Sequence, residues 1–507
     1  MTTTDGDVPV RNVPPWLERD PPRSHEPLAG QFRADVAIVG AGITGVTLAR
    51  ALSDAGASVA LVEADRVGLG VSCFTTAKVT ALQATIYSRI RSNHGTEAAA
   101  VYARASTDAL EWIARQAGSE ESGDSFRRRT AFTYAADEDQ RRQVESEADA
   151  ARDAGLGVEL VDEVPLPYPT FGAVALPDQA EMDPYAYLLA LARGLDPGAV
   201  RIFEGSRVTS VSDGTPCRVR TAGGEVVCDR VVLATLTPIL DRSLAFARTH
   251  AERSYCVAFE ASADLAKGMH ISAGSPTRSV RSHPRGGGEV LIVGGEGHKV
   301  GQTRSHRERY RTLEGFAGDH FGAGDPLARW SAQDWVSADG APLVGPVNPL
   351  TGRLYMATGY GKWGMTTGTA AALALADVLS DRDSDFIESF GSNRLKPLAS
   401  AASLVKENAD AGLHFFADRL RERGSRSSAE LAAGEAGIVQ HDGRRSAAFR
   451  DEEGRLHAVS PTCTHLLCQV RWNDAERSWD CPCHGSRFAL DGAVLQGPAT
   501  KPLERLI

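Results

Sequence analysis

The chain has 507 residues, which is longer than a domain with a single hydrophobic core usually is, so we expect two or three structural units. Hydrophobic residues make up 42% and charged residues 24%, a balance typical of globular proteins, so disorder is not expected. Lys and Arg number 55 against 65 Asp and Glu, which gives a formal net charge of −10. Such a chain offers no net counter-charge to a nucleic-acid backbone, and we predict no nucleic-acid partner.

The N-terminus has no basic cluster followed by an apolar run, and no stretch reaches the roughly 18 apolar residues that a membrane-spanning helix needs. We therefore expect no membrane span and a cytoplasmic location. Four of the eight cysteines are scattered singly, as small buried side chains usually are. The other four fall within residues 463–483, and this crowding is the first chemical signal.

The elements alternate between strand and helix along the first three quarters of the chain. A Pro-rich and charged arm, residues 1–34, precedes a predicted strand (35–39), a glycine turn, a helix and a second strand (58–62). Further helices are predicted at 96–118, 138–155 and about 366–380, with strands at 218–221, 226–234, 257–260, 290–294 and 352–358. This order is typical of an α/β fold interrupted by strand-rich insertions.

The first glycine turn matches the pattern G-x-G-x-x-G at Gly40, Gly42 and Gly45. The three glycines serve a tight turn, a close approach of backbone N–H groups to a pyrophosphate, and close packing of helix on strand. Glu63 ends the next predicted strand, where a carboxylate can accept hydrogen bonds from ribose hydroxyls. The pattern predicts a dinucleotide site but does not decide between FAD and NAD.

A second glycine pattern at residues 290–301 is less complete. Gly295 and Gly297 follow a predicted strand, but Val300 stands where the third glycine belongs, and no second strand with a terminal acid follows at the right distance. The pattern therefore does not favour an NADH site. His298 and Lys299 are either pocket residues of a substrate domain or solvated residues of a surface turn.

The order of several segments resembles the D-amino-acid-oxidase-type family of FAD-dependent oxidoreductases, which includes glycine and sarcosine oxidases and other amine oxidases and dehydrogenases. Residues 70–78 resemble the loop around the flavin phosphates and ribityl chain, and residues 339–345 and 359–366 resemble the C-terminal flavin signature. The resemblance covers about residues 35–385. It implies FAD, and the lack of an obvious His or Cys attachment motif favours noncovalent binding.

The resemblance also implies which residues meet the flavin. A helix that begins near Met365 would direct its positive end at the negative charge of a reduced flavin. The implied FAD-binding residues are Gly40, Ala41, Gly42, Ile43, Thr44, Gly45, Glu63, Ala64, Thr75, Thr76, Ala77, Lys78, Val208, Ala234, Thr235, Gly361, Lys362, Trp363, Gly364, Met365 and Thr366. The candidate catalytic residues are His298, Lys299, Lys362 and Trp363. Spacing does not select a carboxylate-binding arginine among Arg278, Arg281 and Arg285.

Two short motifs near the C-terminus, C-T-H-L-L-C and C-P-C-H-G-S, each supply one Cys and one His to a metal centre. A Rieske [2Fe-2S] cluster needs two thiolates on one iron and two imidazoles on the other, and a zinc site would also accept this set. The extra cysteine in each motif favours the cluster, and residues 429–507 resemble Rieske domains. The resemblance implies Cys463, His465, Cys481 and His484 as ligands and a disulfide between Cys468 and Cys483.

Three further positions bear on the reduction potential of such a cluster. The resemblance implies that the Ser486 hydroxyl donates to a bridging sulfide. Phe488 stands where high-potential Rieske proteins commonly have a tyrosine that donates to a cysteine sulfur, and Leu467 replaces the more usual glycine of the first motif. These two departures predict a potential below the highest Rieske values.

Together the motifs predict an α/β fold, with a Rossmann-like FAD-binding domain and an inserted antiparallel-sheet substrate domain, plus a C-terminal all-β Rieske domain. The predicted boundaries are an arm (1–34), an oxidoreductase domain (35–385, with insertions at about 86–150 and 250–330), a helical connector (386–428) and the Rieske domain (429–507).

A flavin accepts two electrons and the cluster carries one at a time. We therefore predict an amine or amino-acid dehydrogenase that passes electrons from a small-molecule substrate through FAD and the cluster to an unidentified acceptor. The alternatives are an oxygen-using oxidase with an ancillary Rieske domain and a non-catalytic redox sensor or electron carrier.

Overall fold

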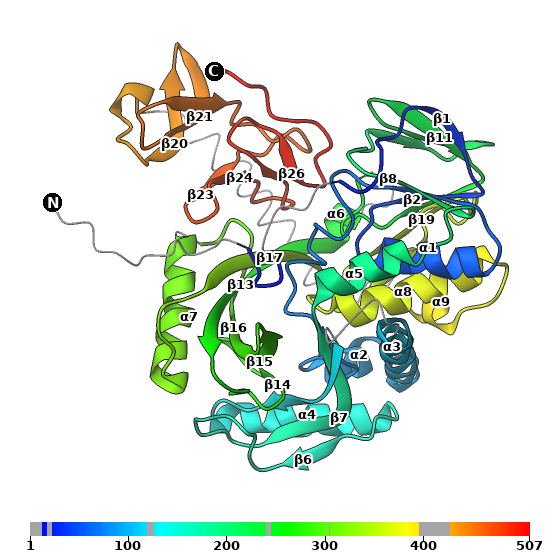
Figure 1. The fold of residues 1–507 in the computed structure, drawn as a ribbon, viewed down its shortest axis with the longest axis vertical. Helices are drawn as coiled ribbons and strands as arrows, with labels where there is room; N and C mark the ends of the chain where they lie inside the picture. Colours follow the sequence, from blue (N-terminus) through cyan, green and yellow to red (C-terminus); the bar gives the residue numbers. More distant parts are fainter. Residues whose placement is uncertain (1–12, 18–22, 119–125, 240–244, 304, 395–425) are drawn as a thin grey trace.

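The structure, a computed structural model, describes residues 13–17, 23–118, 126–239, 245–303, 305–394 and 426–507 (Figure 1). Within this part of the chain the strands form five sheets. The expected fold class is confirmed, with an α/β unit, an inserted strand-rich layer and an all-β C-terminal region.

The first sheet carries the glycine turn. Its strands, in spatial order, are β18 (Leu343–Pro346), β19 (Leu354–Thr358), β12 (Arg230–Leu233), β2 (Val36–Val39), β3 (Val59–Val62) and β8 (Val200–Phe203). All neighbours are parallel except β18 and β19. Every residue of β2 and β3 is buried, as expected for uninterrupted apolar runs in a sheet that is covered on both faces.

Helix α1 (Ile43–Asp54) links β2 to β3 and packs against α8 (Gly364–Leu379). A Cβ at Gly368 of α8 would lie only 2.8 Å from Thr44 Oγ1, so a glycine is needed where the two helices approach. The N-termini of α1 and α8 are therefore brought to the same side of the sheet, although the two helices are separated by some 300 residues of sequence. The remaining helices are α2 (Ile86–His94), α3 (Thr96–Ala117), α4 (Glu138–Asp153), α5 (Pro184–Arg193), α6 (Ala245–Arg248), α7 (His306–Phe321) and α9 (Asp385–Phe390).

The inserted layer is a nine-stranded, mostly antiparallel sheet. Its strands run in the order β17 (Ala328–Ser337), β13 (Thr249–Ala261), β16 (Gly288–Lys299), β15 (Arg278–Arg285), β14 (Met269–Ser272), β5 (Phe126–Tyr134), β7 (Ala173–Met182) and β4 (Lys78–Val79), and β6 (Glu159–Val161) pairs with β7. On one face, Val257 and Val293 pack with Leu313 of α7. On the other, Cys256, Gly294 and Ser279 lie side by side in register.

A third sheet has the order β1 (Gly30–Arg33), β11 (Gly224–Cys228), β10 (Cys217–Arg220) and β9 (Ser210–Ser212). The single strand predicted at 226–234 is wrong, because β11 and β12 belong to different sheets. The backbone N–H groups of Asp229 and Arg230 both donate to Asp35 O, which turns the chain from one sheet into the other.

The predicted N-terminal arm is packed where it is described. Residues 30–33 form β1, and the Trp16 indole N–H donates to Cys73 O at 2.7 Å. The Trp16 ring also lies edge-on to Trp330 of β17, so this part of the arm covers the loop at residues 70–77.

The C-terminal region consists of two antiparallel sheets, which Figure 1 shows in orange and red. The first contains β20 (Ala436–His441), β21 (Arg444–Arg450) and β22 (Leu456–Val459), and the second contains β23 (Arg471–Asn473), β24 (Ser478–Asp480), β25 (Arg487–Phe488) and β26 (Val494–Gln496). A short 3₁₀ helix (Ser428–Glu430) precedes them. Their shared core includes Val459, Trp479 and Phe488.

The boundaries expected for the four regions stay predictions, and most of the connector at 386–428 lies outside the described residues. None of the helices that the structure describes has the length and hydropathy needed to cross a bilayer. The cytoplasmic location stays a prediction.

Candidate functional site

The glycine turn is shaped by close backbone approaches. Gly40 has φ +102°, and a Cβ there would lie 2.6 Å from Ala234 O, while a Cβ at Gly45 would lie 1.9 Å from Gly40 O. Only glycine fits at these two positions. Gly42 is the N-cap of α1, whose first turn carries no acidic side chain. The turn therefore offers a helix N-terminus suited to a pyrophosphate.

Glu63 lies against this turn. Its carboxylate accepts hydrogen bonds from the backbone N–H groups of Ala41 (2.7 Å) and Asp65 (2.9 Å). Burial raises the pKa of Glu63, and the two N–H donors oppose that effect. The Glu63 carboxylate is thus fixed at the edge of the turn, where the sequence predicts the acceptor for ribose hydroxyls. Ala64, also a predicted FAD-binding residue, follows Glu63 in the chain.

Ala234 and Val208 lie beside the same turn. The Ala234 N–H donates to Val39 O, and its carbonyl meets Gly40, while Thr235 donates through Oγ1 to Thr237 O. Val208 is buried in the apolar cluster that contains Val39 and Val62. The elements thus bring these predicted FAD-binding segments together around the carboxyl ends of β2, β3 and β12.

A cavity of about 340 Å³ lies between the α/β unit and the nine-stranded sheet. From the α/β side it is lined by Thr75 and Thr76 and by Lys362, Trp363 and Met365, and Lys78 lines it from β4, the edge strand of the nine-stranded sheet. From the sheet it is lined by residues of β13, β15 and β16 that include Cys256, Ser279 and Gly294. The two flavin-like segments, far apart in sequence, therefore share one cavity with the inserted sheet.

Lys78 is the buried cation of this cavity. Its ammonium nitrogen donates to His270 O at 2.7 Å and to the Ser279 hydroxyl, and the structure records no carboxylate as an ion-pair partner among the described residues. Burial, and then the nearby Arg281 guanidinium, lower the pKa of Lys78 to about 7. A neutral amine is therefore available in the cavity near neutral pH.

The other charged groups of the cavity wall are paired. Lys362 Nζ lies 2.8 Å from Glu252, whose pKa is held well below its usual range by His250 and Lys362. Glu296 pairs with Arg278 (2.8 Å) and Arg309 (3.0 Å). Of the other arginines considered for carboxylate binding, Arg281 pairs with Glu181 and Arg285 with Glu260.

The four candidate catalytic residues are placed differently. Lys362 and Trp363 line the cavity, and Lys362 adopts φ +77° with its backbone N–H held by Asp334 Oδ2 at 2.6 Å. Burial raises the pKa of Asp334 to about 6. His298 and Lys299 lie outside the lining; the His298 ring contacts the Tyr255 hydroxyl at 2.8 Å, and burial lowers its pKa to about 4.

The C-terminal motifs form two facing loops. The thiols of Cys463 and Cys481 are both buried and contact each other, and Cys463 Sγ also accepts hydrogen bonds from the backbone of His465 and Leu466 and from the Ser486 hydroxyl. The rings of His465 and His484 lie edge to face, with centroids 5.1 Å apart. Two thiols and two imidazoles therefore converge, with N–H and O–H donors around the sulfur atoms.

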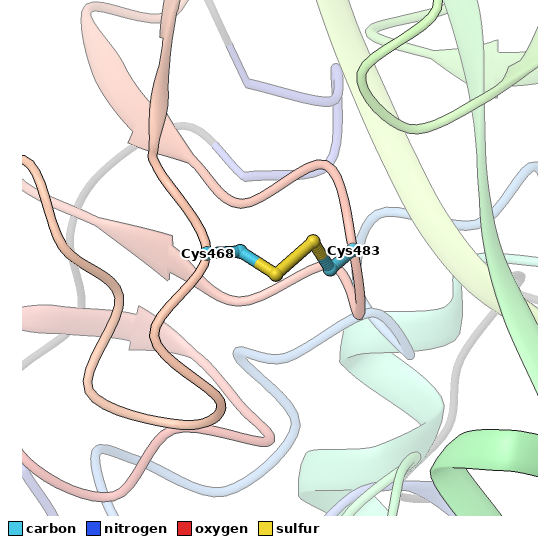
Figure 2. Close-up of a disulfide and its surroundings, with 2 residues drawn as sticks. All are labelled: Cys468 and Cys483. Carbon is cyan, nitrogen blue, oxygen red and sulfur yellow. A yellow bond between two sulfur atoms is a disulfide. The ribbon is translucent and has the colours of Figure 1, made fainter. Parts of the chain in front are cut away.

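A disulfide between Cys468 and Cys483 joins the two loops (Figure 2). The sulfur atoms of Cys468, Cys481 and Cys483 lie within 4.8 Å of one another. Two of the three are consumed by the disulfide, so this group is not itself a metal site. The donor set that remains, two cysteines and two histidines in two clipped loops, fits a Rieske cluster.

Comparison with known proteins decides the family. Residues 35–378 match the model described as FAD dependent oxidoreductase of the DAO type, and residues 425–506 match the Rieske [2Fe-2S] domain. The chain is 33% identical over 474 residues, 93% of each chain, to YhfW of Bacillus subtilis (strain 168), which is named as a Rieske 2Fe-2S iron-sulfur protein. The chain belongs to the DAO-type FAD-dependent oxidoreductases and ends in a Rieske domain. Its cofactors are FAD and a [2Fe-2S] cluster.

Solved structures share the fold of the oxidoreductase part. Glycine oxidase from Geobacillus kaustophilus superposes with a TM-score of 0.58 at 19% identity, covering 72% of this chain and 99% of that one. L-Proline dehydrogenase from P. horikoshii superposes with a TM-score of 0.60 at 16% identity, covering 72% and 98%. The turn, Glu63 and the cavity of this oxidoreductase fit FAD, which supplies hydride acceptance when bound.

The Rieske domain faces the oxidoreductase through its histidine loops. The Phe246 ring of α6 lies edge-on to both His465 (5.9 Å) and His484 (5.3 Å). A Cβ at Gly485 would lie 2.6 Å from Ala251 and 3.1 Å from the Trp335 ring. These contact residues could not be found from the sequence, because Phe246 stands in no recognisable motif and its partners are more than 200 residues away.

Replacing Phe488 with tyrosine is expected to raise the reduction potential of the Rieske cluster. Phe488 is fully buried in β25 and shares a core with Cys463 and Cys481. One added hydrogen bond to sulfur, at about 1 kcal/mol, stabilises the reduced and more negative cluster by about 40 mV for a one-electron couple. A redox titration followed by the cluster spectrum measures this. Phe488→Leu, which adds no donor, should show no upward shift, and an equal potential in Phe488→Tyr would remove Phe488 from the donor position.

Proposed function

We propose that this protein is an amine or amino-acid dehydrogenase in which electrons pass from the substrate to FAD, then to the Rieske cluster, and then to a one-electron acceptor. One observation carries the proposal. Strand β13 lines the cavity, and β13 and its neighbour β17 also contact Gly485, next to His484 in the second ligand loop of the Rieske domain. A two-electron site and a one-electron site thus share one structural unit.

The proposed roles follow the placement of the residues. Gly40–Gly45, Glu63 and Ala234 would hold the dinucleotide, and Thr75, Thr76 and the segment from Gly361 to Thr366 would hold the flavin. Cys463 and Cys481 would ligate one iron, and His465 and His484 the other. The Cys468–Cys483 bridge would keep the two ligand loops in register.

We further assign the proton-accepting role to Lys78. An amine transfers hydride from its α-carbon only when the nitrogen lone pair is free, so a substrate that arrives as an ammonium ion must first lose a proton. Lys78 lines the cavity, and its Nζ donates hydrogen bonds to His270 O and to the Ser279 hydroxyl. Its pKa is about 7. Its neutral amine would take the proton of the substrate ammonium ion, and the free amine would then give up its α-hydride to FAD and become an iminium ion.

An anaerobic substrate panel tests the proposed function. Glycine, sarcosine, L-proline and simple primary and secondary amines are added to the full-length protein without oxygen, and the flavin absorbance is followed. At least one should bleach the flavin, and in air the same substrate should yield little hydrogen peroxide. Stoichiometric peroxide would instead indicate an oxidase, and a flavin that no amine or amino acid reduces would contradict an amine-oxidising function.

A further inference from the structure

A buried ion cluster joins the Rieske domain to the flavin-domain sheet. Arg253 of β13 is fully buried, and its guanidinium lies 2.8 Å from Asp480 and 3.3 Å from Glu476. Arg487 completes the cluster by pairing with both carboxylates. Two guanidinium groups thus match two carboxylates, and only Arg253 comes from the flavin domain. Such a cluster is stable only while every member stays in place, because an unmatched buried charge is strongly unfavourable.

Arg253 holds both ends of the second ligand loop. At the first end it pairs with Asp480, which immediately precedes the ligand Cys481. At the other end it donates to the Gln333 side-chain oxygen at 3.0 Å, while the Gln333 side-chain nitrogen donates to Gly485 O at 2.6 Å. Gly485 immediately follows the ligand His484. The loop that carries both ligands is therefore spanned by one arginine and its glutamine neighbour.

Strand β17, which carries Gln333, also contacts the flavin segment at residues 361–362. Asp334, next to Gln333, accepts the backbone N–H of Lys362 at 2.6 Å, and Trp335 O accepts the backbone N–H of Gly361 at 3.1 Å. Three consecutive residues of β17 thus connect the ligand loop to the segment that lines the cavity. The ligand loop packs tightly on β13 and β17, since a Cβ on Gly485 would clash with Ala251 and Gln333.

A second contact, independent of this cluster, holds the hairpin between β23 and β24. Asp474 accepts the His306 backbone N–H at 2.7 Å and the Ser305 hydroxyl at 2.9 Å at the start of α7. Arg471 donates to Gly301 O at 2.6 Å. The hairpin that precedes the second ligand loop is therefore also anchored on the flavin domain.

We propose that Arg253 is a positioning residue that docks the Rieske domain on the flavin domain in one fixed arrangement, so that electrons reach the cluster without a domain movement. This inference rests on the proposed function. In the step concerned, reduced FAD loses one electron and the oxidised [2Fe-2S] cluster gains it. The second electron follows after a one-electron carrier has reoxidised the cluster.

Flash photoreduction of the flavin in the full-length protein tests this without a substrate. A deazaflavin photoreductant reduces the flavin, and the cluster spectrum then reports the arrival of the electron. In the wild type the transfer should be independent of protein concentration. Arg253→Met should slow it by about tenfold or more, because one buried partner of each carboxylate is lost. The amides of Cys481 and of residues 483–486 should exchange hydrogen faster in the variant, a readout that does not depend on turnover.

Arg444→Met is the matched control, because Arg444 pairs with Glu504 on the exposed side of the same domain. It should transfer electrons and exchange amides as the wild type does. If the Arg253→Met protein does not retain its [2Fe-2S] cluster, Gln333→Leu is used as the test variant instead. Gln333→Leu keeps every charge and should also slow the electron transfer. Electron transfer and amide hydrogen exchange at wild-type rates, in a variant that retains its [2Fe-2S] cluster, would overturn the positioning role of Arg253. A wild-type flavin that is reduced while a dithionite-reducible cluster stays oxidised would instead overturn the proposed function.

Discussion

Replacing His465 or His484 with alanine is expected to abolish the low-average-g resonance of the reduced Rieske cluster. The two rings lie edge to face with their centroids 5.1 Å apart, one from each ligand loop. Loss of one imidazole leaves an iron one ligand short and removes the mixed Cys and His ligation that defines this centre. Electron paramagnetic resonance and iron analysis of the reduced proteins measure the effect.

His441→Ala serves as the control in the same domain, because His441 contacts Ser428 at 2.9 Å, away from the ligand loops. It should keep the full resonance. A wild-type signal in His465→Ala or His484→Ala, or zinc without iron in protein made with ample iron, would contradict the ligand assignment.

Replacing Lys78 with methionine is expected to lower the limiting rate of flavin reduction by an amine about 100-fold or more, the usual contribution of a general base. Lysine accepts a proton only when neutral, and burial lowers the pKa of Lys78 to about 7. The wild-type rate should therefore rise with pH through about 7 and level off above it. Lys78→Met should lose this step, and Lys78→Arg, which stays charged, should also be slow. Stopped-flow absorbance at saturating substrate measures both.

Lys267→Met is the corresponding control, since Lys267 is exposed and does not line the cavity. It should retain the wild-type rate and pH profile. A Lys78→Met protein that binds FAD normally and shows the unchanged pH profile would exclude Lys78 as the proton acceptor.

The parts that could be predicted from the sequence are those encoded by neighbouring residues. Gly45 is needed because its helix packs directly on Gly40 of the same turn, so the glycine pattern of six consecutive residues could be found without knowing the fold. The two Cys and His motifs are equally local, because each loop must present two ligands to one cluster. The apolar runs at 35–39 and 58–62 likewise predicted two strands, and every residue of β2 and β3 is buried.

The parts that could not be predicted depend on contacts between distant segments. Arg253 and Glu476 are 223 residues apart, and nothing in either local sequence identifies the partner. The run at 226–234 has one continuous β pattern, but Asp35 captures two of its N–H groups and divides it between two sheets. Lys78 was placed in the flavin loop, yet its low pKa arises from burial against His270 and Ser279.

The measurement that tests the central claim most directly is anaerobic mixing of the full-length protein with one equivalent of an amine that reduces its flavin. Flavin absorbance and the electron paramagnetic resonance of the cluster are followed in the same samples. The flavin should bleach first and the Rieske resonance should then appear, at a rate that does not change on dilution of the protein. A flavin that is fully reduced by the amine beside a cluster that stays oxidised, although dithionite reduces it, would contradict electron transfer from FAD to the Rieske centre.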